Sequence, residues 1–137
     1  MGKTLAEKII AAHSDQAEVS AGDLVTVDVT VVMANDITAP IAIEAFNAVG
    51  VGEVYNPDNI MLVPSHFAPN KDIKSAEQTR TLATFAEAQA LTHRFQVGRA
   101  GIEHVVLPER GLVLPGDLVI GGDSHTCTYG AVGAFAT

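Results

Sequence analysis

The chain has 137 residues, 47% of them hydrophobic, and its 16 acidic against 8 basic residues give a formal net charge of -8. This length predicts one domain, and the acidic balance excludes a nucleic-acid-binding surface, which needs clustered lysine and arginine. No stretch approaches the roughly 20 apolar residues of a transmembrane helix, and residues 1–14 lack the apolar core of a signal peptide. We therefore expect a cytoplasmic protein that binds neither nucleic acid nor membrane.

The amino-terminal residues predict a short amphipathic helix. Leu5 and Ile9 fall at helical spacing. Thr4 precedes them, and Glu7 follows Thr4 by three residues, which is the pattern of a capping box. The turn expected at residues 21–23 (AGD) ends this unit.

A strand, a helix and a second strand are predicted next. Residues 24–33 are almost all β-branched or apolar, which favours a buried strand of the parallel type. Residues 35–40 are expected to form a loop in which Thr38 is the N-cap of a helix that runs to Val49. After a turn, residues 60–63 predict a second short strand.

The second half of the chain continues this alternation. Residues 75–94 place apolar side chains along one face and predict the longest helix. Residues 104–107 form a short apolar run, and residues 117–120 predict a strand that leads directly into a polar segment. The alternation predicts an α/β fold, a layered α/β/α domain with a mainly parallel sheet whose sites lie at the carboxyl ends of strands. Residues 130–137 end without a helix stop signal, so we expect the domain to be incomplete.

The densest group of reactive side chains is Asp123, Ser124 and His125, which follow the glycine pair 121–122. Glycine allows the backbone to approach a ligand closely, and a carboxylate beside an imidazole is suited to proton transfer. A plain Asx turn, in which Asp123 only caps the backbone, is the structural alternative. The position after a predicted strand favours a site.

Two further histidines are candidates. His66 follows a predicted strand, and His104 lies in the apolar run, where an imidazole is often buried against a carboxylate. His13 and His93 lie in predicted helices without polar neighbours of interest, and we expect no function for them.

Two other kinds of chemistry remain open at this point. His66, His104, His125 and Asp123 could bind one zinc or iron ion, although their spacing matches no ligand motif. Cys127 could be a nucleophile paired with a histidine, but cysteine is as often a small buried residue. As the single cysteine, it cannot supply a disulfide or a four-cysteine site within the chain.

Residues 121–131 (GGDSHTCTYGA) and 133–137 (GAFAT) closely resemble a signature of the 3-isopropylmalate dehydratase large-subunit family in the aconitase superfamily. The resemblance extends through residues 101–109 (GIEHVVLPE), 67–72 (FAPNKD) and 35–40 (NDITAP), so it spans the chain. Members of this family are a few hundred residues longer. The resemblance therefore implies that residues 1–137 are a truncated amino-terminal part of the large-subunit catalytic domain, inactive alone.

The resemblance implies a lyase that dehydrates and rehydrates a hydroxy di- or tricarboxylate at a 4Fe-4S cluster, with one iron acting as a Lewis acid. Asp123 and His104 would form a pair that assists proton movement, and His66 would act on the leaving hydroxyl. His125 would lie near the oxygen bound to the open iron. The substrate carboxylates would receive hydrogen bonds from Ser124 and Asn35.

Two positions depart from the family pattern. Ser65 stands where the family commonly has an aspartate, and a serine brings no negative charge to His66. Asn35 stands where some relatives have glutamine or histidine, which changes the reach towards a carboxylate.

The remaining parts of the family's site are implied to lie outside this chain. The cluster cysteines come from downstream, so Cys127 is not a ligand. A serine base and a substrate-binding arginine come from a separate small subunit with a swivelling domain.

Several functions compete. Isomerisation of isopropylmalate in leucine biosynthesis is the leading hypothesis. Homoaconitase activity and the hydration of a dimethylmalate- or maleate-type substrate are the alternatives within the same superfamily. A non-catalytic dicarboxylate-binding domain that uses Asn35, Ser124 and His125 is the alternative from another class. A mononuclear metallohydrolase is the third.

Overall fold

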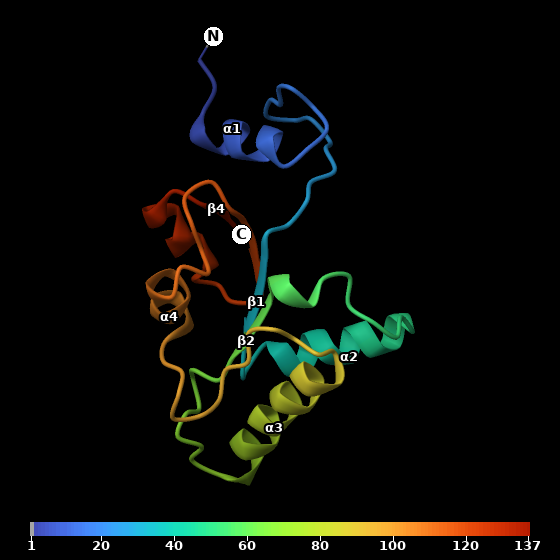
Figure 1. Ribbon diagram of the computed structural model, residues 1–137, viewed down its shortest axis with the longest axis vertical. Helices are drawn as coiled ribbons and strands as arrows, with labels where there is room; N and C mark the ends of the chain where they lie inside the picture. The colour runs from blue at the N-terminus through green and yellow to red at the C-terminus, as the bar shows by residue number, and fades with distance from the viewer. Residues whose placement is uncertain (1) are drawn as a thin grey trace.

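The computed structural model describes residues 2–137 as a parallel four-stranded sheet with helices on both faces (Figure 1). The strands are β1 (Val31–Asn35), β2 (Ile60–Val63), β3 (Leu118–Gly121) and β4 (Phe135–Ala136), in the order β2-β1-β3-β4. The helices are α1 (Leu5–Ala12), α2 (Ala39–Val49), α3 (Ile73–Ala88) and α4 (Glu103–Glu109), with 3₁₀ helices η1 (Pro57–Asn59) and η2 (Thr126–Val132). Every pair of neighbouring strands is parallel, which confirms the predicted α/β class.

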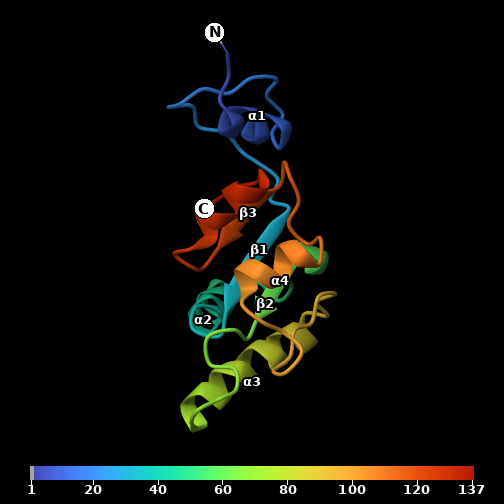
Figure 2. The same cartoon turned by 90° about the vertical axis from the view of Figure 1, so that its left-hand side faces the viewer.

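Alternation along β1 separates two apolar cores. Val31 and Met33 face a core that includes Leu107 of α4. Ala34 faces a second core that includes Ile43 of α2 and residues of α3. Figure 2 shows α2 and α4 on opposite sides of β1. Because side chains alternate between the faces of a strand, β1 is covered on both sides and the helix-sheet-helix layering is confirmed.

The prediction of a strand over residues 24–33 is wrong for its first seven residues. The strand begins at Val31, and residues 24–30 form an extended connection between α1 and the sheet (Figure 1). Leu24 is 98% exposed, and among the described residues the ladder with β3 begins only at Val31, although the Asp28 and Thr30 N–H groups donate to the carbonyl oxygens of His13 and Leu118. β-branched residues favour extended backbone, but a strand also needs a neighbour that accepts its hydrogen bonds.

Other boundaries differ in smaller ways. The capping box of Thr4 and Glu7 is present, and the longest helix is α3, which begins at Ile73 behind its own capping residue Asp72 and ends at Ala88. The apolar run 104–107 lies in helix α4. None of the helices formed by residues 2–137 is long and apolar enough to cross a membrane.

The strand order places a crevice at one end of the sheet. From β1 the chain moves outwards to β2 on one side, and later to β3 on the other side. Open α/β sheets bind ligands beyond the carboxyl ends of strands where the order reverses in this way. In register, Met33 pairs with Gly121, so residue 123 lies level with Asn35, and Asn35 pairs with Val63. Three chain segments therefore leave the sheet side by side.

Gly121 allows the turn after β3 to close. A Cβ atom at this position would lie 2.0 Å from the Oγ1 atom of Thr126. That hydroxyl donates a hydrogen bond to the carbonyl oxygen of Asp123, 2.6 Å away. The absence of a side chain at residue 121 therefore allows Thr126 to brace the segment that presents Asp123.

We expect Gly121→Ala to destabilise the fold by about 1–3 kcal/mol, because the new methyl group forces Thr126 or the backbone to move. Gly130→Ala is the matched control, since a Cβ there meets no atom within 4 Å. The control should change stability by no more than about 0.5 kcal/mol. Urea unfolding of the two variants measures both effects, and equal stabilities would contradict this account of the turn.

Candidate active site

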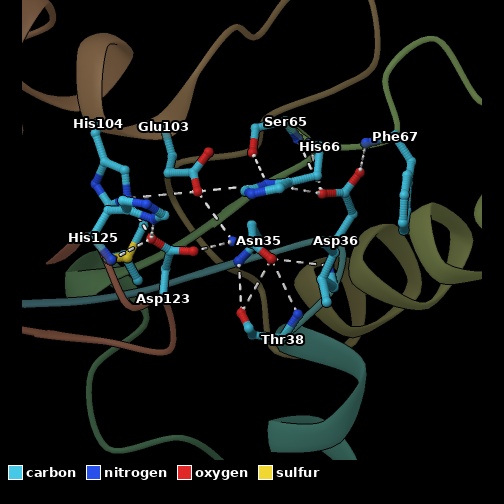
Figure 3. A network of polar contacts seen from close by, with 12 residues as sticks. Asn35, Asp36, Thr38, Ser65, His66, Phe67, Glu103, His104, Asp123 and His125 are labelled. Atoms are coloured by element: carbon cyan, nitrogen blue, oxygen red, sulfur yellow. Dashed lines mark hydrogen bonds and ion pairs between the residues drawn. The ribbon is translucent and has the colours of Figure 1, made fainter.

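The segments after β1, β2 and β3, together with the start of α4, bring their polar side chains into one network (Figure 3). Asn35 ends β1, and His66 follows β2. Asp123 follows β3, while Glu103 and His104 begin α4. The structure thus brings together residues that are up to 88 positions apart in the chain.

Asn35 is the buried hub of this network. It is 0% exposed, and its side-chain nitrogen donates to Oε1 of Glu103 at 3.0 Å and to Oδ2 of Asp123 at 3.3 Å. Its side-chain oxygen accepts from the backbone N–H groups of Ile37 and Thr38. Both ends of the amide are engaged, so direct substrate binding by Asn35 would require these bonds to break. Its present contacts hold two carboxylates in place.

Thr38 occupies the N-cap position of α2, as predicted, but its side chain makes no capping bond. Its hydroxyl instead accepts from the backbone N–H of Asn35 at 3.2 Å and donates to the Asn35 side-chain oxygen at 3.3 Å. The first turn of α2 is therefore tied to the end of β1. This link fixes the rotamer of Asn35.

Asp123 accepts hydrogen bonds from two imidazoles. Its Oδ1 atom lies 2.8 Å from Nε2 of His104 and 3.1 Å from Nδ1 of His125, and it also accepts the backbone N–H of His125 at 2.8 Å. Burial alone would raise the pKa of Asp123, but the hydrogen bonds from His104 and His125 outweigh burial and lower this pKa to about 2. Asp123 is therefore a stable anion, and a carboxylate in this position fixes the orientation of an imidazole.

His104 is packed tightly beside this carboxylate. Its side chain is 13% exposed, and its ring centroid lies 5.2 Å from that of Tyr129. Burial, together with the negative charges of Glu103 and Asp123, raises the pKa of Tyr129 above its ordinary value. The Tyr129 side chain that packs against His104 is therefore uncharged. The Nδ1 atom of His104 is buried and has no hydrogen-bond partner among the described residues.

Asp36 positions the segment after β2. It is completely buried, and its carboxylate accepts the backbone N–H groups of Ser65, His66 and Phe67 at 3.3, 2.9 and 2.7 Å. A carboxylate that accepts several backbone N–H groups makes strong, charge-assisted bonds. Asp36 thus attaches the loop that carries His66 to the end of β1.

His66 lies at the open side of the two fully buried carboxylates, Glu103 and Asp36. Its Nδ1 atom lies 2.9 Å from the Ser65 hydroxyl, 3.7 Å from Oε1 of Glu103 and 3.9 Å from Oδ1 of Asp36. Glu103 is only 1% exposed. Sequence reasoning missed the roles of Asp36 and Glu103, because one stands inside a loop motif and the other at the edge of an apolar run.

An open pocket of about 700 Å³ covers the network. It is lined by Ser65, His66, Ile102, Glu103, His104, Asp123, Ser124, His125, Cys127 and Thr128. This volume suits a small metabolite. Ser124 and His125 are exposed, and the Ser124 hydroxyl lies 3.4 Å from Nδ1 of His125. His66, His104, Asp123, Ser124 and His125 therefore meet at one pocket, with Asn35 beneath them, while His13 and His93 lie elsewhere.

Two groups of three side chains are close enough to hold a metal ion. They are His104 with Asp123 and His125, and His66 with Glu103 and Asp123. In the first group the nitrogen-oxygen distances of 2.8 and 3.1 Å are those of hydrogen bonds, which explain the arrangement without an ion.

The cysteine content does not fit an iron-sulfur cluster built by this chain alone. Cys127, the single cysteine, is exposed and lines the pocket. A 4Fe-4S cluster is held by several thiolates. Any cluster at this pocket needs ligands from outside residues 1–137.

Residues 7–137 match the Aconitase family (aconitate hydratase). The chain belongs to the aconitase family. Over all 137 residues it is 59% identical to the 3-isopropylmalate dehydratase large subunits of Thermodesulfovibrio yellowstonii and Moorella thermoacetica. It is 55% identical, over the same length, to the 2,3-dimethylmalate dehydratase large subunit of Eubacterium barkeri.

These alignments cover 32% of each of the first two proteins and 33% of the third, so the chain spans about a third of the length of these relatives. The resemblance to the aconitase superfamily that the sequence motifs indicated is confirmed.

The low pKa of Asp123 predicts a pH-dependent contribution to stability. Because the pKa of about 2 in the folded state lies below the ordinary value of 3.8, the anion stabilises the fold above pH 4. This contribution is lost as pH falls from about 4 towards 2. The stability advantage of the unaltered chain over Asp123→Asn should therefore shrink across this window in urea unfolding. Parallel pH profiles would contradict the assignment, and Asp28→Asn on an exposed carboxylate is the control.

Asp36→Asn should destabilise the fold by about 1–3 kcal/mol, because an amide nitrogen cannot accept the backbone N–H groups that the carboxylate accepts. Amide hydrogen exchange of residues 65–67 should speed up more than exchange in the strands. Exposed Asp15→Asn is the control and should change stability by no more than about 0.5 kcal/mol. Unchanged exchange at residues 65–67 would show that Asp36 does not hold this loop.

Proposed function

We propose that this chain is the amino-terminal part of the catalytic domain of a dehydratase large subunit. Its reaction would be the reversible dehydration of a substituted malate, with isopropylmalate isomerisation in leucine biosynthesis as the first candidate. The identity of 59% to two 3-isopropylmalate dehydratase large subunits supports this choice. Because the chain spans about a third of these relatives, the activity would belong to the longer protein.

The Asp123–His104 pair, with side chains 9% and 13% exposed at the wall of an open pocket, is the observation that best supports proton-transfer chemistry. Dehydration removes a proton from carbon and releases a hydroxyl group, which leaves as water only if it gains a proton. His104, oriented by the carboxylate 2.8 Å away, would hold or move that proton at its ring nitrogens. His66, with its ring 37% exposed, would donate a proton to the leaving hydroxyl.

Substrate binding would use the open side of the pocket. The exposed Ser124 hydroxyl would donate a hydrogen bond to a substrate carboxylate, and His125 would lie beside the reacting hydroxyl. The Asn35 amide would contribute indirectly, by holding Asp123 and Glu103. Exposed Ile102 offers apolar contact for an alkyl substituent.

The charge of the pocket supports a partner that completes the site. The lining includes two carboxylates and no lysine or arginine. A dicarboxylate substrate would be repelled by these anions unless cationic groups approach from outside residues 1–137. A separate small subunit would supply an arginine and the serine base, and cysteines from the remainder of the large subunit would hold a 4Fe-4S cluster.

A second substrate has similar support. The 2,3-dimethylmalate dehydratase large subunit of Eubacterium barkeri is 55% identical to this chain, within the range of 53–59% of the 3-isopropylmalate dehydratase large subunits. Both names describe a malate skeleton with alkyl substituents.

The test uses the full-length large subunit co-purified with its small subunit, loaded with iron and sulfide under anaerobic conditions. We expect the complex to dehydrate 3-isopropylmalate or 2,3-dimethylmalate. The ultraviolet absorbance of the unsaturated product measures the rate of this reaction. His104→Asn should lower kcat by about 10²–10⁴-fold, the usual contribution of a general acid-base group. His93→Gln, outside the pocket, is the matched control and should leave kcat unchanged.

The absence of turnover with both substrates would contradict the proposed activity. Binding of a dicarboxylate without turnover would favour the non-catalytic alternative. Full activity of His104→Asn would remove the Asp123–His104 pair from the mechanism.

A further inference from the structure

Glu103 is a buried carboxylate between two histidines. It is 1% exposed, and its Oε1 atom lies 3.0 Å from the Asn35 amide nitrogen. The same oxygen lies 3.7 Å from Nδ1 of His66 and 3.7 Å from Nε2 of His104. Its other oxygen, Oε2, is buried and has no hydrogen-bond partner among the described residues. A charge in such a place is costly unless positive charge develops nearby.

The contacts of the groups around His66 show which carboxylate could balance a positive charge on its ring. Ser65 offers only a hydroxyl, which can orient the ring but cannot balance a positive charge. Asp36 is also close, at 3.9 Å, but its oxygens already accept three backbone N–H groups. Asp123 bonds two other imidazoles. Glu103 therefore has the largest unused capacity to accept a proton donor beside His66.

Asn35 holds the carboxylates of Glu103 and Asp123 in place. Its single amide nitrogen donates to Glu103 and to Asp123, so it shields two anions from each other while fixing both. With Oε1 held by Asn35, Glu103 faces the ring nitrogens of His66 and His104 from a fixed position. No lysine or arginine lines this pocket to compete for the carboxylate.

We propose that Glu103 is the positioning residue of the site and supplies the counter-charge for protonated His66 that Ser65 cannot provide. The use of that proton on a leaving hydroxyl rests on the proposed function, whereas the coupling between Glu103 and His66 does not. Glu103 itself touches no substrate in this account. It acts through His66, by placing a negative charge 3.7 Å from the ring nitrogen.

The test measures how fast diethyl pyrocarbonate modifies each histidine of the 137-residue chain, by peptide mass spectrometry. The reagent forms a bond between its carbonyl carbon and an unprotonated ring nitrogen, and releases carbon dioxide and ethanol. At about pH 5.5, below the ordinary histidine pKa of about 6.5, the rate reports the small unprotonated fraction. His66 is accessible, since its side chain is 37% exposed.

We expect Glu103→Gln to increase the modification rate of His66 at least about fivefold, the effect of removing one charge at 3.7 Å even if water screened the pair fully. Glutamine keeps an oxygen that can accept from Asn35, so the fold is disturbed little. Adding Ser65→Asp to this variant should return the rate towards that of the unaltered chain, because a negative charge is restored beside the ring. Glu109→Gln, exposed on the same helix, is the matched control.

An unchanged rate at His66 in Glu103→Gln would overturn the proposal. So would a faster rate that Ser65→Asp does not reverse, because a purely structural role of Glu103 predicts no rescue by charge. His93 is the internal reference, and its acceleration together with His66 would indicate unfolding. In that case Ser65→Asp alone decides: slower modification of His66 supports the proposal, and an unchanged rate overturns it.

These measurements need no substrate, cluster or partner, so they separate this inference from the proposed function. If the complete enzyme turns over and the modification rates do not respond to charge, only the role of Glu103 fails. If the rates respond as expected and no turnover occurs, only the dehydratase proposal fails.

Discussion

A single amide nitrogen, on Asn35 at the carboxyl end of β1, donates to the carboxylates of Glu103 and Asp123, which come from different parts of the chain. Like charges so close together would repel each other strongly in a medium of low dielectric constant. The amide makes the arrangement possible because it donates to one oxygen of each carboxylate, while Oδ1 of Asp123 accepts from two imidazoles and Oε1 of Glu103 lies 3.7 Å from two. The positions of Asp123, Glu103 and the three histidines beside them therefore depend on the rotamer of Asn35, and this rotamer depends on Thr38 at the start of α2.

The motifs after the strands could be located from the sequence because glycine pairs, histidines and carboxylates at strand ends have few structural uses. Residues 60–63 form β2 as predicted, and the polar segment that begins at Asp123 lines the pocket. Local pattern was also sufficient for α1, whose capping box involves residues only three positions apart.

The sequence could not show which segments pair as strands or which side chains from distant segments come into contact. Residues 24–30 have the composition of a strand, but pairing depends on which segments fold beside them, and nothing within those seven residues encodes that. The same limit hid Glu103, whose neighbours Asn35 and His66 are separated from it by 68 and 37 positions. From sequence alone, a charged residue at the edge of an apolar run is expected to be exposed to solvent at the end of a helix. Glu103 is buried because residues at the end of β1 and after β2 lie against it.

The three backbone N–H groups that Asp36 accepts connect the His66 loop to the same strand that ends in Asn35. His66 and the Asp123–His104 pair are consequently both anchored to the carboxyl end of β1. A shared anchor on one strand predicts that these side chains keep their spacing when a ligand binds, so that little reorganisation energy is needed on this side of the pocket.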